Sequence, residues 1–230
     1  MITDIPSNLQ EIQNRIHNAC QRAGRSPEEV TLIAVSKYQP IPSLEQAYQW
    51  GCRHFGENRV QELMEKHDVM PQDIQWHMIG HLQRNKVKYV IGRSCLIHSV
   101  DSLRLAEEIS RESQKKDVTS RILLEVNVAE EESKFGMKNE EVPLLVSQIA
   151  ALPNLKIEGL MTIAPYVQNP EENRKHFSKL KNLSVDILNK SIDNVSMNVL
   201  SMGMTGDFEV AIEEGATCVR VGTGIFGERI

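Results

Sequence analysis

Short apolar runs alternate with longer amphipathic stretches along almost the whole sequence. The apolar runs are rich in β-branched residues and read as strands, at residues 30–36, 53–55, 74–79, 95–100, 121–128, 156–160, 197–200 and 217–221. The amphipathic stretches predict helices over residues 7–23, 43–50, 59–67, 85–91, 102–115, 140–151, 170–189 and 207–214. Such an alternation of strands and helices predicts a parallel sheet.

The number of these units favours a closed sheet. Eight strands alternating with helices, after one additional helix at the amino end, fit a (β/α)8 TIM-type barrel in 230 residues. A doubly wound open sheet is the alternative, but the order of the units contains no clear reversal signal. No linker or shift in composition divides the sequence, so we expect a single domain over residues 1–230.

Composition narrows the possible partners and compartment. The net charge of −5 disfavours a nucleic-acid role, which needs concentrated lysine and arginine. Four widely spaced cysteines without a C-x-x-C pair predict reduced buried thiols, and we expect no metal site: Cys20, Cys52, Cys95 and Cys218. The amino end does not resemble a signal peptide, and no apolar run approaches the ~18 residues of a membrane span. These features predict a cytoplasmic protein with no membrane association.

Lys37 is the first candidate for chemistry. It directly follows the apolar run 30–36, and Pro40 stops the strand three positions later. Desolvation at the end of a buried strand would lower the pKa of the amine and make it a nucleophile able to form a Schiff base with an aldehyde or ketone. Alternatively, the side chain extends its ammonium group into solvent.

Two glycine-containing loops lie where (β/α)8 barrels commonly bind phosphate. They follow the seventh and eighth predicted strands, at residues 201–207 and 222–224. Glycine lets the backbone approach an anion, and serine or threonine hydroxyls add donors. Each loop alone could be a plain turn, but both loops together with Lys37 predict a phosphate site.

Arg220 lies on the eighth strand, two residues before Gly222, so the two share a face. If that face points into the barrel, the guanidinium needs an acceptor, either a ring nitrogen of a ligand or a barrel carboxylate. An outward position is the remaining alternative. A Schiff-base lysine, a phosphate site and this arginine together suggest pyridoxal 5'-phosphate (PLP). Arginine would leave the pyridine nitrogen unprotonated, which weakens carbanion stabilisation.

Several segments carry a family resemblance. They are A-V-S-K-Y-Q-P at 34–40, H-F-G-E-N-R-V-Q-E at 54–62, H-M-I-G-H-L-Q-R-N-K at 77–86, G-L-M-T-I at 159–163, L-S-M-G-M-T-G-D at 200–207 and V-R-V-G-T-G-I-F-G at 219–227. In this order they resemble the PLP homeostasis (PLP-binding) proteins, single-domain relatives of the alanine racemase barrel.

The resemblance implies roles for ten residues. Lys37 would carry the aldimine and Arg220 would face the pyridine nitrogen. The phosphate would be surrounded by Ser201, Gly203, Thr205, Gly222 and Thr223. Asn58, His81 and Met161 would line the pocket around the ring, although His81 could be an ordinary loop residue and Met161 simple core packing.

The predicted function is PLP homeostasis, that is, storage, buffering or delivery of PLP without substantial turnover, with apo PLP-dependent enzymes as candidate partners. Alanine racemases add a C-terminal domain that supplies a tyrosine base, and the sequence stops after the eighth strand. Tyr38 and Tyr166 follow predicted strands and are candidates to replace that tyrosine. Neither has a residue next to it in the sequence that would activate it as a base, so we assign no catalytic residue. A racemase-like PLP enzyme is the alternative, and a class I aldolase is a third reading. A monomer is plausible, and the acidic loop 130–134 receives no role.

Overall fold

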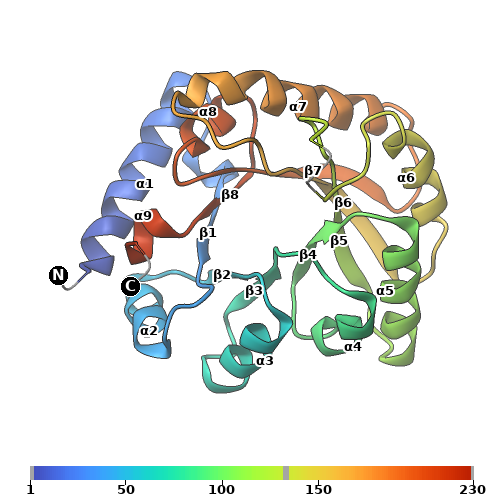
Figure 1. Cartoon of the computed structure of the whole chain (residues 1–230), viewed down its shortest axis with the longest axis horizontal. Coiled ribbons are helices and arrows are strands. Elements are labelled where there is room, and N and C mark those ends of the chain that lie inside the picture. The colour runs from blue at the N-terminus through green and yellow to red at the C-terminus, as the bar shows by residue number, and fades with distance from the viewer. Residues whose placement is uncertain (1–2, 132–134, 229–230) are drawn as a thin grey trace.

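The computed structural model describes residues 3–131 and 135–228, and within them eight parallel strands close into a barrel in chain order (Figure 1). The first strand pairs with the last, Ile33 beside Arg220, which closes the sheet. The predicted (β/α)8 fold is therefore confirmed, and the open sheet is excluded. The strands are β1 (Thr31–Val35), β2 (His54–Glu57), β3 (Gln75–Met78), β4 (Leu96–Val100), β5 (Ser120–Glu125), β6 (Leu155–Met161), β7 (Val195–Met204) and β8 (Cys218–Val221).

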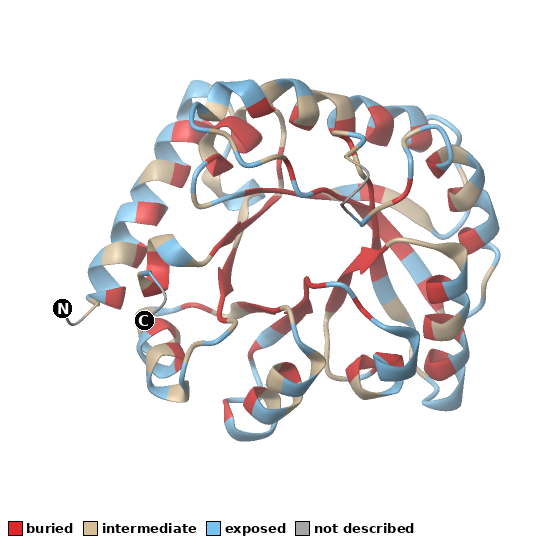
Figure 2. Ribbon diagram, viewed as in Figure 1, coloured by how far each residue is buried: buried red, intermediate tan, exposed pale blue. Residues whose placement is uncertain are grey.

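Helices surround the barrel and turn their apolar faces toward it (Figure 2). They are α1 (Ile5–Arg22), α2 (Ile41–Trp50), α3 (Val60–Val69), α4 (Val87–Val90), α5 (Leu103–Lys115), α6 (Val142–Ala150), α7 (Arg174–Leu188), α8 (Phe208–Glu213) and α9 (Thr223–Phe226). Short 3-10 turns precede β1, α4 and α7, at Pro27–Glu29, Arg84–Lys86 and Pro170–Asn173. Burial of one stripe per helix is the main source of the helices' stability.

The extra helix α1 completes the outer layer. The helix after β8 is only four residues long, and α1 packs against α8, α9 and α2 at this position (Figure 1). Its inner stripe of Leu9, Ile12 and Ile16 is buried, as the sequence predicts. Asp4 accepts a hydrogen bond from the Ser7 amide and caps the helix. The amino-terminal helix therefore belongs to the barrel.

Most element boundaries differ from the sequence predictions by a few residues, and some differences have a visible cause. Ser102, the first residue of the predicted helix 102–115, is the N-cap of α5, because its hydroxyl accepts from the Leu105 amide at 3.4 Å. The predicted helix 170–189 begins as a 3-10 turn at Pro170, and β7 is longer than the predicted 197–200. Of the acidic loop, residues 132–134 lie outside the described residues, whereas Glu130 pairs with Lys179 at 2.5 Å.

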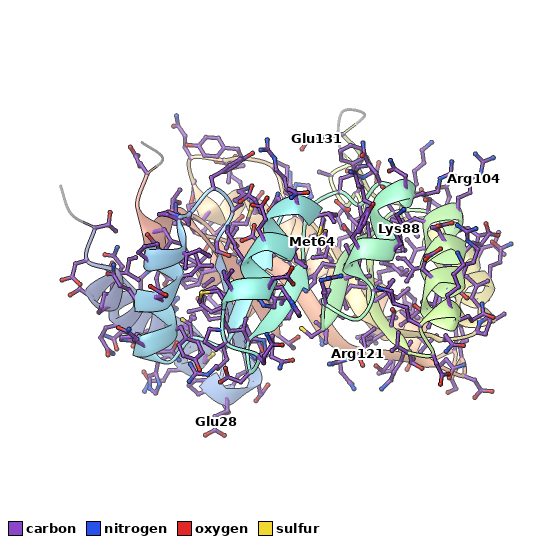
Figure 3. All side chains as sticks on the ribbon, turned by 90° about the horizontal axis from the view of Figure 1, so that it is seen from below. Glu28, Met64, Lys88, Arg104, Arg121 and Glu131 are labelled. Atoms are coloured by element: carbon purple, nitrogen blue, oxygen red, sulfur yellow. The ribbon has the colours of Figure 1, made fainter. Side chains whose placement is uncertain are left out.

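The two ends of the barrel are distinct. Glu28 before β1 and Arg121 at the start of β5 lie at one end, and Glu131 after β5 lies at the other (Figure 3). All strands therefore present their carboxyl ends on the same side, where barrel enzymes and binding proteins place their sites. Cys20, Cys52 and Cys218 are buried, Cys95 is half-buried, and all four thiols are free. No described helix is both long and apolar enough to cross a membrane.

Candidate functional site

A pocket of about 650 Å³ opens at the carboxyl ends of the strands. Its walls come from the carboxyl ends of β1, β2, β3, β6, β7 and β8 and the loops that follow them. Tyr166 lines it, and so do six of the ten residues to which the resemblance assigns roles: Lys37, Asn58, Thr205, Arg220, Gly222 and Thr223. The closure of the barrel therefore brings together the strand-end lysine, the strand-eight arginine and parts of both glycine-containing loops.

Lys37 lies in a turn just beyond β1, and both neighbouring residues are anchored. The Ser36 carbonyl accepts from Lys66 Nζ at 2.7 Å, and the Tyr38 amide donates to Glu62 Oε2 at 2.6 Å. Tyr38 has a φ of +64°, in the left-handed region that a tyrosine adopts at a cost. The Arg59 guanidinium lies 4.7 Å from the centre of the Tyr38 ring. These contacts fix the backbone that carries Lys37.

Arg220 points into the barrel, which excludes the outward-facing alternative. It is buried, and its Nη1 donates to Ser201 Oγ at 2.5 Å while Nη2 donates to the Thr162 carbonyl at 2.8 Å. Within the described part of the chain, no carboxylate lies at ion-pair distance from it. Burial lowers the pKa of Arg220, whereas Cys218, Glu125 and Asp207 act to raise it. Because both of its hydrogen-bond acceptors are neutral, the Arg220 guanidinium can bind a further hydrogen-bond acceptor of a ligand in the pocket.

The loops after β7 and β8 meet at the rim of the pocket. Thr223 Oγ1 donates to Thr205 Oγ1 at 3.1 Å, and the Gly224 amide reaches the same oxygen at 3.4 Å. A Cβ on Gly224 would lie 3.0 to 3.2 Å from Val221, Thr205 and Ile12, so glycine permits this close packing. The two hydroxyls and the glycine backbone form a surface suited to an anion.

The pocket also contains acceptors without partners. Asn58 Oδ1 and Asn173 Oδ1 are buried, and neither has a hydrogen-bond partner among the described residues. Both residues line the pocket. A buried acceptor without a partner is unfavourable, so a ligand that presents hydrogen-bond donors at these positions would remove the penalty.

Comparison with known proteins gives a consistent result. The model of the family described as "Alanine racemase, N-terminal domain" matches residues 7–230. A pyridoxal phosphate homeostasis protein of Aquifex aeolicus strain VF5 is 46% identical over 222 residues, covering 96% of each chain. PipY of Synechococcus elongatus PCC7942, solved with PLP bound, is 33% identical with a TM-score of 0.84, covering 97% of this chain and all (100%) of that chain.

A protein of Bifidobacterium adolescentis described as unknown is also similar, with 36% identity, a TM-score of 0.93 and coverage of 98% of each chain. The chain belongs to the pyridoxal phosphate homeostasis protein family. This membership confirms the resemblance seen in the sequence motifs. It rests on nearly the whole length of the chain, because the matches cover almost all of both partners.

Four of the ten residues that the resemblance to this family singles out lie outside the pocket wall. Ser201 lies behind Arg220, and Gly203 packs on α8, where a Cβ would be 2.6 Å from that of Ala211. Met161 is buried with Leu96 and Leu123. Met161 therefore packs in the core, which is one of the two alternatives that the sequence left open for it.

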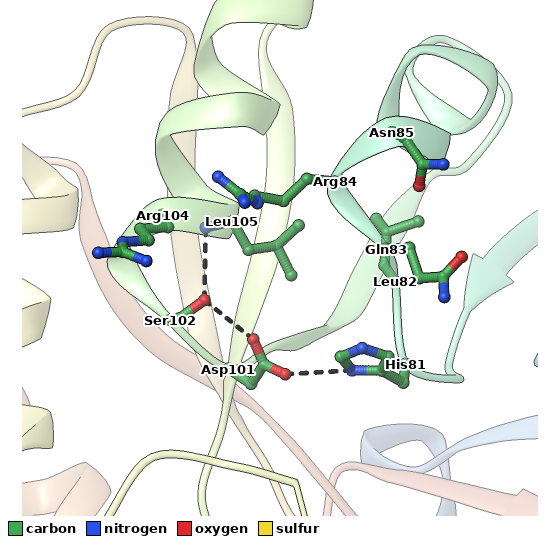
Figure 4. A pocket seen from close by; sticks show the side chains of 9 residues that line it. All are labelled: His81, Leu82, Gln83, Arg84, Asn85, Asp101, Ser102, Arg104 and Leu105. Atoms are coloured by element: carbon green, nitrogen blue, oxygen red, sulfur yellow. Dashed lines mark hydrogen bonds and ion pairs between the residues drawn. The ribbon is translucent and has the colours of Figure 1, made fainter.

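His81 lines a second pocket of about 530 Å³, between the loop after β3 and the start of α5 (Figure 4). Its Nδ1 pairs with Asp101 Oδ2 at 3.1 Å, and its ring stacks on Phe135 with a centroid distance of 4.0 Å. Arg84 and Arg104 also line this second pocket, with the Ser102 hydroxyl bonded to Asp101 (Figure 4). The structure therefore separates His81 from the residues around Lys37.

A buried ion pair beneath Lys37 was not foreseen in the sequence. Lys66 Nζ donates to Glu57 Oε1 at 2.7 Å, and the Ser36 hydroxyl donates to the same oxygen at 2.6 Å. Burial raises the pKa of Glu57 even though Lys66 lowers it. The only signal in the sequence was a glutamate two residues after the predicted strand 53–55.

Glu125 is the second functional candidate that sequence reasoning missed. It is buried at the carboxyl end of β5. Burial, together with the charge of Asp101, raises its pKa to about 7, although Arg220 acts in the opposite direction. The carboxyl group therefore changes charge near neutral pH, beside the arginine of the pocket.

Proposed function

We propose that this protein binds PLP in the pocket around Lys37 and Arg220 and takes part in intracellular PLP homeostasis by storing, buffering or delivering it. The observation that carries the proposal is the convergence of Lys37, Arg220 and both threonine-bearing loops on one pocket. The relative PipY, which was solved with PLP bound, supports the choice of ligand. The whole chain, residues 1–230, would form the one binding domain.

The residues of the pocket suit the chemical groups of PLP. When bound, PLP supplies an aldehyde that condenses with a primary amine and releases water. Lys37 provides such an amine, and Arg220 provides N–H donors for the ring nitrogen. Thr205, Gly222 and Thr223 would bind the phosphate, and the unpartnered Asn58 Oδ1 can accept from a donor on the ligand.

We infer that the protein holds PLP without substantial turnover. Arg220 remains a donor, so a ring nitrogen that it binds stays unprotonated, and such a ring withdraws electrons weakly. Racemisation also needs a second proton carrier opposite the lysine. Tyr166 is 95% exposed, so solvent surrounds its hydroxyl rather than an activating base. The proposal includes a cytoplasmic, monomeric protein that passes PLP to apo PLP-dependent enzymes.

Spectroscopy of the purified protein with PLP tests the ligand and the lysine. We expect a visible absorption band that saturates with PLP, and borohydride reduction should fix the PLP mass on Lys37. Lys37→Ala should lose the band and the reducible bond, whereas Lys175→Ala, at an exposed lysine of α7, should keep both. Unchanged covalent attachment in Lys37→Ala would overturn the assignment.

Two further assays separate a carrier from an enzyme. Incubation of the PLP-loaded protein with the common amino acids should give no racemised or transaminated product, and clear turnover would favour the racemase-like alternative. Mixing the loaded protein with an apo PLP enzyme should restore that enzyme's activity, with Lys37→Ala as the control. Sedimentation analysis should give the mass of one chain, 26.1 kDa.

A further inference from the structure

Three histidines form a continuous row through the barrel, and none of them was singled out for chemistry in the sequence. They are His98 on β4, His77 on β3 and His54 on β2, here called the histidine network. His98 Nε2 lies 2.9 Å from His77 Nδ1, and His77 Nε2 lies 3.0 Å from His54 Nδ1. Adjacent ring centroids are 5.1 and 5.2 Å apart.

The histidine network connects the pocket to the opposite end of the barrel. At one end, His98 Nδ1 lies 2.9 Å from Ser201 Oγ, which accepts from Arg220. At the other end, His54 is the first residue of β2 and is only half-buried. Arg220 lines the pocket at the carboxyl ends of the strands. The contacts therefore run without interruption from the pocket to the amino ends of the strands.

The imidazoles in the barrel are neutral. Burial lowers the pKa of His77 to about 3 and that of His98 well below the usual value. A neutral imidazole has one donor and one acceptor nitrogen, so all bonds of such a row must point the same way. Each histidine turns its Nδ1 toward Ser201 and its Nε2 away from it. The row therefore has two possible directions, one with every proton on Nε2 and one with every proton on Nδ1.

The charge of Arg220 decides between these directions. The guanidinium can only donate, so Ser201 Oγ accepts from it. If Ser201 then donates to His98, every dipole of the network turns its negative end toward the cation. In the opposite direction, the Nδ1–H of His98 would donate to Ser201 Oγ and point its positive end toward Arg220. The Ser201 hydroxyl, which would then accept twice, would have to donate to the sulfur of Cys218. Electrostatics favours the first arrangement.

We infer that Ser201 and the histidine network form one directional row of neutral hydrogen bonds that turns its negative end toward Arg220, stabilises this guanidinium where no carboxylate contacts it directly, and holds it toward the pocket. Ser201 and the three histidines are thus positioning residues. The Sγ of Cys95 lies 3.5 Å from His77 Nε2 and can accept from the same Nε2–H that donates to His54, which leaves the direction of the row unchanged. The inference rests on the proposed function only in naming PLP as the occupant of the pocket.

The direction of the row can be measured without any ligand. In protein labelled with ¹⁵N-histidine, long-range ¹H–¹⁵N spectra report which ring nitrogen carries the proton. The three resonances are assigned with single His→Gln variants, and His17, exposed on α1, serves as the solvent-exposed reference. We expect the Nε2–H form at all three positions. The Nδ1–H form or a protonated ring at His77 or His98 would overturn the inference.

Ser201→Ala tests the positioning role. Loss of a hydrogen bond to a charged group corresponds to about a tenfold weaker PLP affinity. The His98 Nδ1 resonance should move toward the value of an unbonded lone pair. Ser201→Thr, which keeps the hydroxyl, should restore both readouts, and Ser110→Ala, at a buried serine of α5, should change neither. Affinity within twofold of wild type in Ser201→Ala would overturn the role. Absence of PLP binding in the wild type would instead refute the proposed function, and the tautomer result would still stand.

Discussion

Two buried cations, Lys66 beneath the turn that carries Lys37 and Arg220 in the pocket wall, are accommodated in different ways. The side chain of Lys66 is 7% exposed, and its ammonium contacts the carboxylates of Glu57 and Glu62 at 2.7 and 3.2 Å. Arg220 is equally buried, but its hydrogen bonds end on a hydroxyl and a carbonyl. Carboxylates therefore contact the first charge directly, whereas the direct hydrogen-bond partners of the second are neutral dipoles.

The difference indicates what each cation does. Lys66 uses its donors within the protein, on Glu57, Glu62 and the Ser36 carbonyl, so it fixes the turn that carries Lys37. Arg220 has no carboxylate at ion-pair distance within the described residues, and Glu125 and Asp207 act on its charge from beyond hydrogen-bond distance. An internally paired charge stabilises a fold, whereas an incompletely balanced one is available to a ligand.

The largest expected effect on stability is that of replacing Lys66. Lys66→Met should lower the free energy of unfolding by about 3–5 kcal/mol, because it leaves the Glu57 carboxylate buried without its partner. Urea denaturation measures this change. The double variant Lys66→Met/Glu57→Gln should recover part of the loss, and Lys175→Met, at an exposed lysine, should stay close to wild type. A single Lys66→Met variant as stable as wild type would show that the ion pair does not support the fold.

The next effect concerns Glu125 and depends on pH. Its pKa in the folded protein is raised from 4.5 to about 7, so the folded state keeps its proton longer than the unfolded state. Between these values the folded state binds more protons, and the free energy of unfolding therefore falls as pH rises. The loss is absent below pH 4.5 and complete above pH 7, where it amounts to up to about 3 kcal/mol.

The glutamine side chain of Glu125→Gln cannot ionise, so this variant should not lose stability through this group as the pH rises. The difference in unfolding free energy between variant and wild type should be constant at low pH and should grow in favour of the variant from about pH 4.5 to pH 7. Urea denaturation at a series of pH values measures it. Glu28→Gln, at an exposed position near the other end of the barrel (Figure 3), is the matched control. A difference that does not change with pH would contradict the raised pKa.

The parts of the site that lie on single segments could be predicted from the sequence. The apolar run that ends at Lys37, and the loops after β7 and β8, are local features whose position follows once the barrel is recognised. Arg220 was placed on the right strand, but its direction and acceptors could not be deduced. Alternation along a strand does not say which of its two faces points into a closed barrel.

The parts that depend on contacts between segments could not be predicted. Lys66 follows Glu62 at the spacing of an exposed helical ion pair, and only the packing of α3 against β2 and the turn after β1 buries it. The histidine network joins three separate strands, so no sequence window contains it. The role of His81 near the ring came only from the family motif, and the structure places this residue in the second pocket.

The smallest expected effect on stability is that of removing Arg220, and it gives the sharpest contrast with Lys66. Arg220→Met deprives the Thr162 carbonyl of its donor, which costs about 1–3 kcal/mol. It also removes a buried charge that has no carboxylate partner, and relief of that desolvation penalty offsets the cost. We therefore expect a change of only about 1 kcal/mol in the free energy of unfolding without ligand, but PLP affinity about thirtyfold weaker. Denaturation and visible titration of the same samples measure both, and a loss of stability as large as that of Lys66→Met would mean that Arg220, too, supports the fold rather than the ligand.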